Sequence, residues 1–294
     1  MKPAVYGLLA LAVIGGVTGW FITRPTALPS TVSDRLTGDA EAGERIFLAS
    51  GCASCHMGTD DGADPKLLLG GAAFQTQFGT FYAPNISPDP DHGIGDWSQA
   101  QFLNAVMRGV SPEGQHYFPA FPYTSYTKAD PQDMADLYAY MMTLPADATP
   151  SRAHDVAFPF NIRRSVGLWK ALYMNRDWVV TGDLTEQETQ GRYLAEALAH
   201  CAECHTPRGA LGGLDRAAWL EGAPNPSGSG RIPPISGADF TWSAFDISAY
   251  LETGFTPSFD VAGGSMAKVI ANLGQLEKPE LDAIAAYILR AAQQ

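Results

Sequence analysis

The longest uninterrupted run of hydrophobic positions lies at the N-terminus of the chain. Between Ala4 and Ile22, Thr18 is the only clearly polar residue among 19. A helix of that length spans about 28 Å, which is close to the hydrocarbon thickness of a bilayer. Tyr6 and Trp20 lie near its two ends, where amphipathic rings favour the membrane interface. The pattern predicts an uncleaved transmembrane anchor over residues 1–24.

A cleaved signal peptide is the alternative for this segment. The apolar region of a signal peptide is usually shorter, and small residues follow it at a cleavage site. This run ends instead in the bulky sequence Trp20–Pro25. Lys2 and Arg24 balance each other at the two ends, so flanking charge does not orient the helix. Residues 25–37 are rich in Thr, Pro and Ser, and they predict a short tether.

Two later stretches of the chain repeat the same helical pattern. Trp97 begins one that ends twelve residues on at Gly109, and Trp242 begins one that ends twelve residues on at Gly254. Each half also closes with an amphipathic helix. In the second half its apolar positions follow the i, i+3, i+4, i+7, i+8 stripe of a helix packed on a core: Leu281, Ile284, Ala285, Ile288 and Leu289. The chain is therefore predicted to contain a duplicated helical unit.

The predicted organisation is two mostly α-helical domains behind the anchor, over residues 38–145 and 187–294. Residues 146–186 have no counterpart in either copy. They contain Phe158 and Phe160 and a helical pattern through Trp169. Because Phe and Trp are scarce in flexible linkers, this segment is predicted to be an ordered connector.

The composition is that of a folded, acidic protein. The chain of 294 residues is 46% hydrophobic and carries a formal net charge of −12. That charge argues against nucleic-acid binding, because a phosphate backbone favours Lys and Arg. An acidic surface fits electrostatic steering toward a basic protein partner, or it serves solubility alone.

The four cysteines carry the strongest chemical signal. All of them fall in two C-x-x-C-H pentapeptides, Cys52–His56 and Cys201–His205. Two thiols at this spacing can add to the vinyl groups of one haem, and the adjacent His then lies beneath the iron. Paired C-x-x-C motifs that hold zinc usually stand tens of residues apart, and a thioredoxin-like dithiol expects one motif in a βαβ context. The sequence predicts two covalently bound haem c groups, with Cys52, Cys55, Cys201 and Cys204 for attachment and His56 and His205 for the iron.

The sixth iron ligand differs between the two halves. Met266 lies twelve residues after Gly254, on a Gly-rich segment before the closing helix, and is the candidate for the second haem. The same position after Gly109 is Phe121, which cannot bind iron. His116 is the nearest donor for the first haem, and a propionate contact or a solvated loop is its alternative role. Otherwise the first iron is five-coordinate and open to small molecules.

Further segments around these motifs carry a family resemblance: Tyr82–Asp89, Gly93–Ser98, Tyr117–Tyr126, Phe158–Arg163, and His200–Arg208 with Leu211 and Gly212. With them the chain resembles the cytochrome c subunits of membrane-bound alcohol, aldehyde and gluconate dehydrogenases, in the class I cytochrome c superfamily. The resemblance implies two tandem class I cytochrome c domains and an axial role for Met266. Relatives commonly carry three haems and a Met where Phe121 stands, and they often have a His where His116 stands.

The function expected from the sequence is electron transfer. Electrons would pass from a dehydrogenase or a cytochrome bc1 complex to a terminal oxidase or a soluble cytochrome. A single-pass anchor in the inner membrane would hold the haem domains in the periplasm, and no catalytic residue is assigned. The rival hypothesis is a dihaem peroxidase or sulfur-compound oxidase that works at an open first haem. A gas sensor is the weakest hypothesis, because the sequence contains no recognisable output domain.

Overall fold

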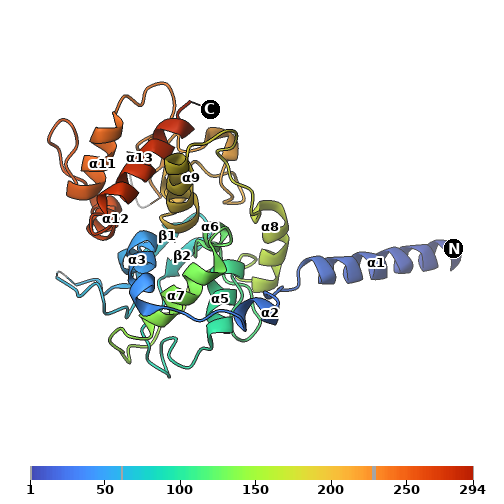
Figure 1. Ribbon diagram of the computed structural model, residues 1–294. Coiled ribbons are helices and arrows are strands. Elements are labelled where there is room, and N and C mark those ends of the chain that lie inside the picture. The colour runs from blue at the N-terminus through green and yellow to red at the C-terminus, as the bar shows by residue number, and fades with distance from the viewer. Residues whose placement is uncertain (1, 61, 227–229, 294) are drawn as a thin grey trace.

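The computed structural model describes residues 2–60, 62–226 and 230–293 (Figure 1). Met1, predicted to begin the anchor, and Gln294, predicted to end the second domain, lie outside the described residues, as do positions 61 and 227–229. The protein is mostly helical, as expected, with two small sheets.

The N-terminal part contains the long helix α1 and the elements that surround the first pentapeptide. Their bounds are α1 Lys2–Ile22, α2 Ser30–Ser33, α3 Ala40–Ser50, α4 Cys52–His56, β1 Ala73–Thr76, β2 Gly79–Tyr82, α5 Gln99–Arg108, α6 Tyr123–Tyr126 and α7 Pro131–Met141. Helix α1 stands away from the body, with its apolar side chains exposed (Figure 1). It is long and apolar enough to cross a membrane, although a signal sequence has the same properties.

The connector and the C-terminal part come next along the chain. The connector contains β3 Asp155–Val156, the 3₁₀ turn η1 Arg163–Ser165 and α8 Val166–Tyr173. The C-terminal part contains α9 Glu186–Arg192, the π-helix η2 Tyr193–Leu198, α10 Ala202–His205, the 3₁₀ turn η3 Arg216–Ala218, β4 Ala223–Pro224, β5 Arg231–Ile232, α11 Ala244–Thr253, α12 Gly264–Leu273 and α13 Lys278–Ala291. We call α3–α7 the first unit and α9–α13 the second unit.

The helices predicted by the twelve-residue repeat form where expected. Helix α5 begins after Ser98 and α11 after Ser243, and each of these serines forms a capping box with the residue three positions on. Both helices end at a glycine in the left-handed conformation, Gly109 and Gly254. The short strands were not predicted, and β3 ties the connector to the first unit by pairing with β2.

Each unit is built on one close helix crossing. Helix α3 crosses α7 at Gly43, where an added Cβ would lie 2.0 Å from the Asp136 carbonyl oxygen. Helix α9 crosses α13 at Gly191, where an added Cβ would lie 1.8 Å from the Ala283 carbonyl oxygen. Only glycine lets two backbones approach so closely. The same crossing therefore precedes both pentapeptides.

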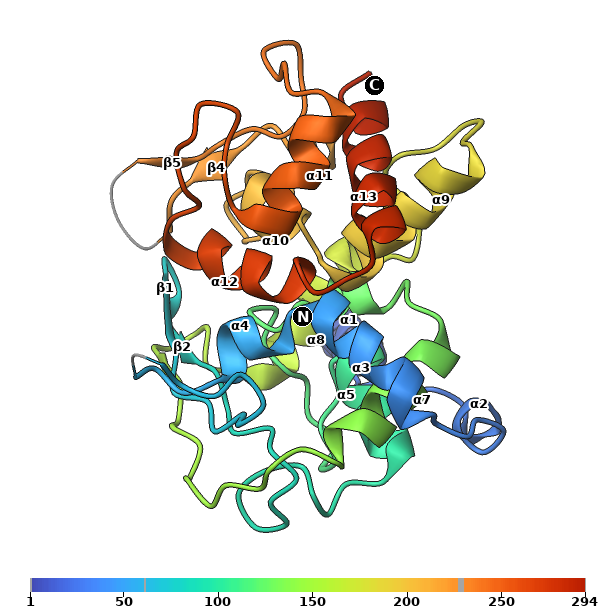
Figure 2. The ribbon, with the colours of Figure 1, turned by 60° about the vertical axis from the view of Figure 1, so that its left-hand side comes forward.

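The two units share one hydrophobic core. Helix α12 of the second unit packs on α4 of the first (Figure 2), and the Asn272 amide donates to the Ser54 hydroxyl across 3.0 Å. Ion pairs and hydrogen bonds also cross the boundary: Lys128 with Glu196, Arg45 with Glu280, and Tyr193 with Asp133. Most of the buried apolar side chains of both units belong to one continuous cluster, and a smaller cluster of Phe81, Phe118 and Val166 joins the first unit to the connector. The two pentapeptides are consequently held in one rigid arrangement.

Candidate functional site: two haem-attachment helices

The two pentapeptides form short helices that begin in the same way. Gly51, with φ 60°, turns the chain into α4, and His200, with φ 42°, does so directly before Cys201 and α10. On each helix the two cysteines stand three residues apart, so their thiols lie on the same face. Burial raises the pKa of the thiols of Cys52 and Cys201 to about 12, so both are neutral in these apolar surroundings.

Each pentapeptide histidine is held by a backbone carbonyl. Nδ1 of His56 donates to the Pro84 oxygen across 2.8 Å, and Nδ1 of His205 donates to the Pro233 oxygen across 2.8 Å. In both cases the carbonyl lies 28 residues after the histidine. Because a carbonyl can only accept, the proton is assigned to Nδ1, and Nε2 keeps the lone pair that binds a metal. Both imidazoles are thus prepared in the tautomer of an iron ligand.

The loops around the histidines repeat the same backbone bonds. The His56 carbonyl accepts from the Gly70 amide, and the His205 carbonyl accepts from the Gly222 amide, both across 2.7 Å. The burial of each histidine lowers the pKa of its imidazole, which keeps it neutral. A neutral ring with a fixed tautomer fits the proximal position beneath a haem iron.

Phe121 and Met266 follow the same backbone hydrogen bond in the two units. The Tyr117 amide donates to the Gly109 carbonyl, and the Ala262 amide donates to the Gly254 carbonyl, both across 2.8 Å. Phe121 and Met266 each follow four residues later. Met266 is partly buried against the core, but it lies in the first turn of α12, because that helix begins at Gly264 rather than after the Gly-rich segment.

Phe121 packs in an aromatic cluster and has no atom that can bind iron. Its ring lies 6.0 Å from that of Tyr117, 6.1 Å from Tyr123 and 6.1 Å from Tyr126, measured between centroids. The Tyr123 hydroxyl is buried and has no hydrogen-bond partner in the part of the chain that the structure describes. A buried hydroxyl of this kind usually has a partner. The orphaned group therefore fits a polar cofactor edge or a bound ligand beside this cluster.

His116 has a partner other than the first haem site. It is buried, and its Nε2 donates to the carbonyl of Thr23, at the end of α1, across 2.9 Å. Its own carbonyl accepts from Arg163 across 3.0 Å. The structure brings His116 to the end of α1, and the equivalent position in the second unit is Val261.

The region between the two pentapeptides holds residues that the sequence did not single out. His200 packs its ring edge-on against Tyr126 with the centroids 5.6 Å apart, and the Tyr126 hydroxyl donates to the Ser50 carbonyl across 3.1 Å. Burial raises the pKa of the Cys55 thiol to about 11, and nearby Cys204 adds to that rise. The pKa of the second cysteine of the first motif thus responds to the second cysteine of the other motif. The sequence did contain a signal for this region. His200 stands directly before the second pentapeptide, where the first unit has a glycine in the left-handed conformation.

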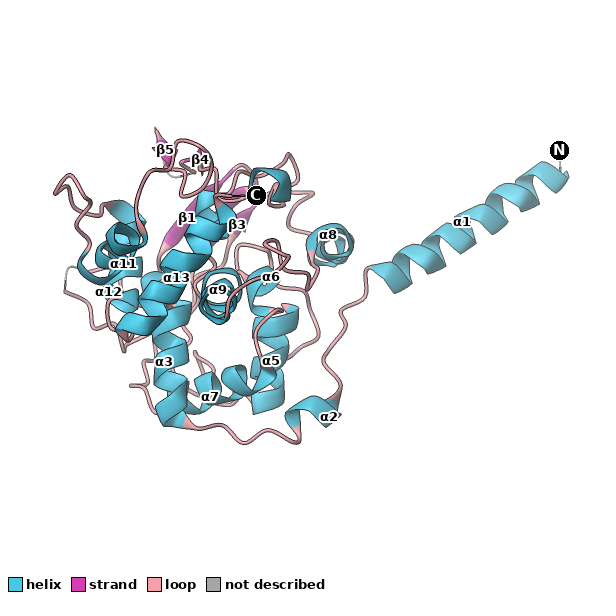
Figure 3. Cartoon of the chain, turned by 45° about the horizontal axis from the view of Figure 1, so that its top comes forward, coloured by secondary structure: helices cyan, strands magenta, loops and turns pink. Residues whose placement is uncertain are grey.

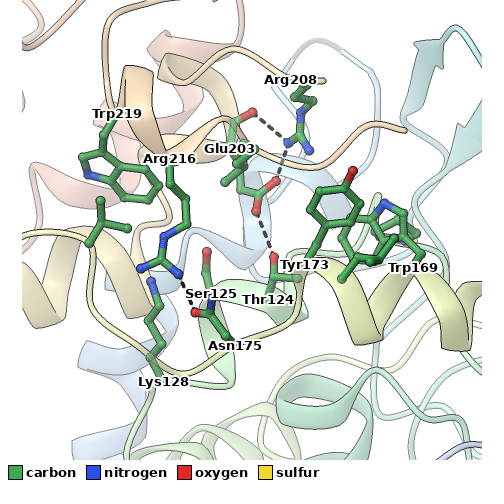
Figure 4. Close-up of a pocket in the computed structure, with 14 residues that line it drawn as sticks. Thr124, Ser125, Lys128, Trp169, Tyr173, Asn175, Glu203, Arg208, Arg216 and Trp219 are labelled. Carbon is green, nitrogen blue, oxygen red and sulfur yellow. Dashed lines mark hydrogen bonds and ion pairs between the residues drawn. The ribbon is translucent and has the colours of Figure 1, made fainter. Parts of the chain in front are cut away.

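A cavity of about 100 Å³ lies behind α10, between α6, the connector and the loop that follows α10 (Figure 4). Glu203 accepts hydrogen bonds there from Arg208 and from the Thr124 hydroxyl. Arg216 donates to the Asn175 side chain across 2.5 Å. These charged groups are already paired within the protein. Their hydrogen bonds link the second unit to the first unit and to the connector. Arg208 also donates to the Gly212 carbonyl.

Two C-x-x-C-H helices, each with a carbonyl-held histidine, define a c-type cytochrome. Residues 40–145 match the Cytochrome c family. The chain is 51% identical over 291 residues to a "Diheme cytochrome c-type" protein of Cereibacter sphaeroides, and the match covers 99% of this chain and 98% of that protein. The chain belongs to the family of dihaem c-type cytochromes, which are electron-transfer proteins with covalently bound haem c.

Two further relatives are cytochrome subunits of dehydrogenases. The fructose dehydrogenase cytochrome subunit of Gluconobacter japonicus is 37% identical, over 84% of this chain and 51% of that protein. The cytochrome c subunit of the alcohol dehydrogenase (quinone) of Gluconacetobacter polyoxogenes is 31% identical, over 95% of this chain and 61% of that protein. This chain thus spans about half to three fifths of these longer relatives. The family resemblance and the haem c cofactor expected from the sequence are confirmed.

Proposed function

We propose that this chain is a membrane-anchored electron carrier with two tandem class I cytochrome c domains, over residues 38–145 and 187–294. The observation that carries the proposal is the repeated hydrogen bond from histidine Nδ1 to a carbonyl 28 residues on. Haem c, when bound, supplies one-electron exchange at its iron. The chain contributes the thiols that attach the two groups and the histidines that hold the irons: Cys52, Cys55, Cys201, Cys204, His56 and His205.

The second haem is proposed to have a His205 and Met266 pair of axial ligands. Met266 stands four residues after the bond between Ala262 and Gly254, partly buried against the core. A thioether ligand raises the reduction potential of a haem relative to a second imidazole. The second haem is therefore proposed to be the higher-potential partner and the exit for electrons.

The first haem is proposed to lack a methionine ligand, since Phe121 fills that position within an aromatic cluster. His116 stays a possible sixth ligand through its Nδ1, which is buried without a hydrogen-bond partner among the described residues while Nε2 donates to the Thr23 carbonyl. We favour its role at the anchor, which leaves the sixth position of the first iron without a protein donor. This site is the point at which the two halves differ chemically.

The donor and the acceptor are proposed from the relatives. Cytochrome subunits of dehydrogenases suggest a dehydrogenase as the electron donor, and a cytochrome bc1 complex is the other candidate. A terminal oxidase or a soluble cytochrome is proposed to take the electrons. The proposed location is the periplasmic face of the inner membrane, with α1 as a single span.

The experiment is a haem count with a coordination assay. We expect two haems per chain by pyridine haemochrome, and one after Cys201→Ala with Cys204→Ala. An unchanged count in that variant would end the assignment of the second site. Electron paramagnetic resonance of the oxidised protein should then show one low-spin haem, which becomes high-spin in Met266→Ala. A low-spin signal that survives this change would remove Met266 from the iron.

A second candidate function is favoured by one observation, the absence of a donor side chain at Phe121. An open first iron should be high-spin, and its spectrum should shift on adding cyanide or peroxide; a dihaem peroxidase or sulfur-compound oxidase would use that open position. Turnover with peroxide and a reduced cytochrome would establish it. An open iron without such turnover would leave the electron carrier alone, and two low-spin haems that ignore these ligands would contradict the open first iron itself.

A further inference from the structure

The middle part of the connector carries a charge opposite to that of the whole chain. From Phe158 to Arg176 it contains four basic residues and no Asp or Glu, in a chain with a net charge of −12. The same segment contains three Phe or Trp residues and Tyr173. Basic and aromatic residues together are typical of segments that lie at the surface of an anionic membrane.

This segment is fixed to the end of α1. The Arg164 guanidinium donates to the Thr23 hydroxyl across 3.0 Å and to the Trp20 carbonyl across 2.7 Å, and it lies 5.3 Å from the centre of the Trp20 ring. Gly167 of α8 packs so closely on Thr23 that an added Cβ would lie 2.4 Å from the Thr23 carbonyl oxygen. The connector is therefore positioned where α1 leaves the body.

Helix α8 lies crosswise to α1. In Figure 3 α8 is seen down its own axis, whereas α1 runs along the page beside it. A helix that lies across the end of a membrane-spanning helix lies parallel to the membrane surface. The position and the direction of α8 are thus those of an interfacial helix.

One face of α8 leaves large apolar side chains exposed. Leu168 is 54% exposed and Leu172 is 61% exposed. They stand four and eight residues after Arg164, so they continue the helical row that starts at the contact with Trp20. Phe158, at the start of the same segment, is 78% exposed. Apolar side chains that are grouped and exposed in this way mark an interaction surface.

We infer that this face of the connector rests on an anionic lipid surface. We call it the α8 surface, and its apolar members are Phe158, Phe160, Ile162, Leu168, Leu172 and Leu211. Leu211 belongs to it because its carbonyl accepts from the Trp169 indole of α8 across 2.8 Å. The inference rests on the proposed membrane anchor and adds a second contact to it. Two contacts fix the orientation of the haem units relative to the membrane. One helix and a flexible tether would leave that orientation free to change.

The test uses the full-length protein in nanodiscs of anionic lipid, with one cysteine added at a time. The native cysteines carry the haems, so the added thiol is the one that reacts with a water-soluble maleimide. Leu168→Cys and Leu172→Cys report on the α8 surface, and Leu11→Cys reports on α1. Phe259→Cys is the control, since Phe259 is 86% exposed in the loop between α11 and α12, on the side of the body away from α1 (Figure 1). Each rate is divided by the rate of the same variant after unfolding, and each variant must retain two haems.

We expect the thiols at 168 and 172 to react at least about tenfold more slowly than the thiol at 259. The free energy of burying an apolar side chain corresponds to at least about a tenfold lower exposure to water, where the maleimide is. Weaker protection is expected in nanodiscs of zwitterionic lipid, and equal protection there would contradict the role of anionic charge. Fast reaction at 168 and 172 with protection at 11 would overturn the α8 surface and leave the anchor intact. Fast reaction at 11 as well would overturn the anchor and, with it, this inference.

Discussion

The buried pair of Lys128 and Glu196 gives a sharp test of how the two units are joined. Nζ of Lys128, in the first unit, lies 3.0 Å from the Glu196 carboxylate in the second, and the side chains are 7% and 0% exposed. The carboxylate also accepts from the Val179 and Val180 amides and from the Tyr287 hydroxyl. Burial lowers the pKa of Lys128, whereas the Glu196 charge raises it and favours the ammonium.

Lys128→Met removes the cation and leaves the carboxylate buried with only neutral donors. Breaking a buried pair in this way costs about 3–5 kcal/mol of unfolding free energy. The matched control is Lys66→Met, whose partner Glu44 lies 3.1 Å away with both side chains about half exposed. Loss of an exposed pair costs about 0–1 kcal/mol.

Urea unfolding of the full-length holoprotein, followed by far-ultraviolet circular dichroism, measures the difference. With a slope of about 3 kcal/mol/M, the midpoint should fall by at least about 1 M in Lys128→Met and by no more than about 0.3 M in Lys66→Met. Adding Glu196→Gln to Lys128→Met removes the buried charge and should restore part of the loss. Equal midpoints for the two single variants would refute the reasoning.

Three further predictions concern single side chains. Met266→Ala should lower the potential of one haem and leave the other unchanged in a redox titration, because a thioether ligand raises the potential; no change at either haem would contradict the assignment. Arg164→Ala should leave the haem spectrum intact and raise the proteolysis rate between residues 23 and 37, since Arg164 binds Thr23 and Trp20; an unaltered rate would mean that this contact does not hold α1 against the connector. Burial lowers the pKa of His116, so its neutral form stabilises the fold above the unfolded pKa of about 6.5, and that stability is lost as the pH falls. His116→Gln keeps a donor for the Thr23 carbonyl and should show a smaller fall in urea midpoint from about pH 7.5 to about pH 5, whereas an equal fall would exclude His116 as a source.

The features that could be predicted from the sequence are local. The C-x-x-C-H spacing is contained in five residues, and helices α5 and α11 carry their own caps at Ser98 and Ser243. The equivalence of Phe121 and Met266 came from counting, because the two units keep the same backbone bonds around Gly109 and Gly254. Local patterns of this kind survive folding unchanged, which is why they were reliable.

The features that could not be predicted depend on distant parts of the chain. The bond from His116 to Thr23 joins residues 93 positions apart, so the sequence left this histidine as a candidate ligand. The carbonyls that hold His56 and His205 belong to prolines in irregular loops, which no periodicity identifies. The strands of two to four residues are too short to show an alternating pattern.

Ahead of its cysteines the second unit has one residue more than the first, and the wide turn of the π-helix η2 accommodates that residue. Gly43 precedes Cys52 by nine residues, and Gly191 precedes Cys201 by ten. A π-helix takes up a single added residue within an otherwise regular helix, so the crossing and the pentapeptide keep their relation in both units. The helix that leads into a pentapeptide can therefore gain one residue without altering the glycine crossing on which each unit is built.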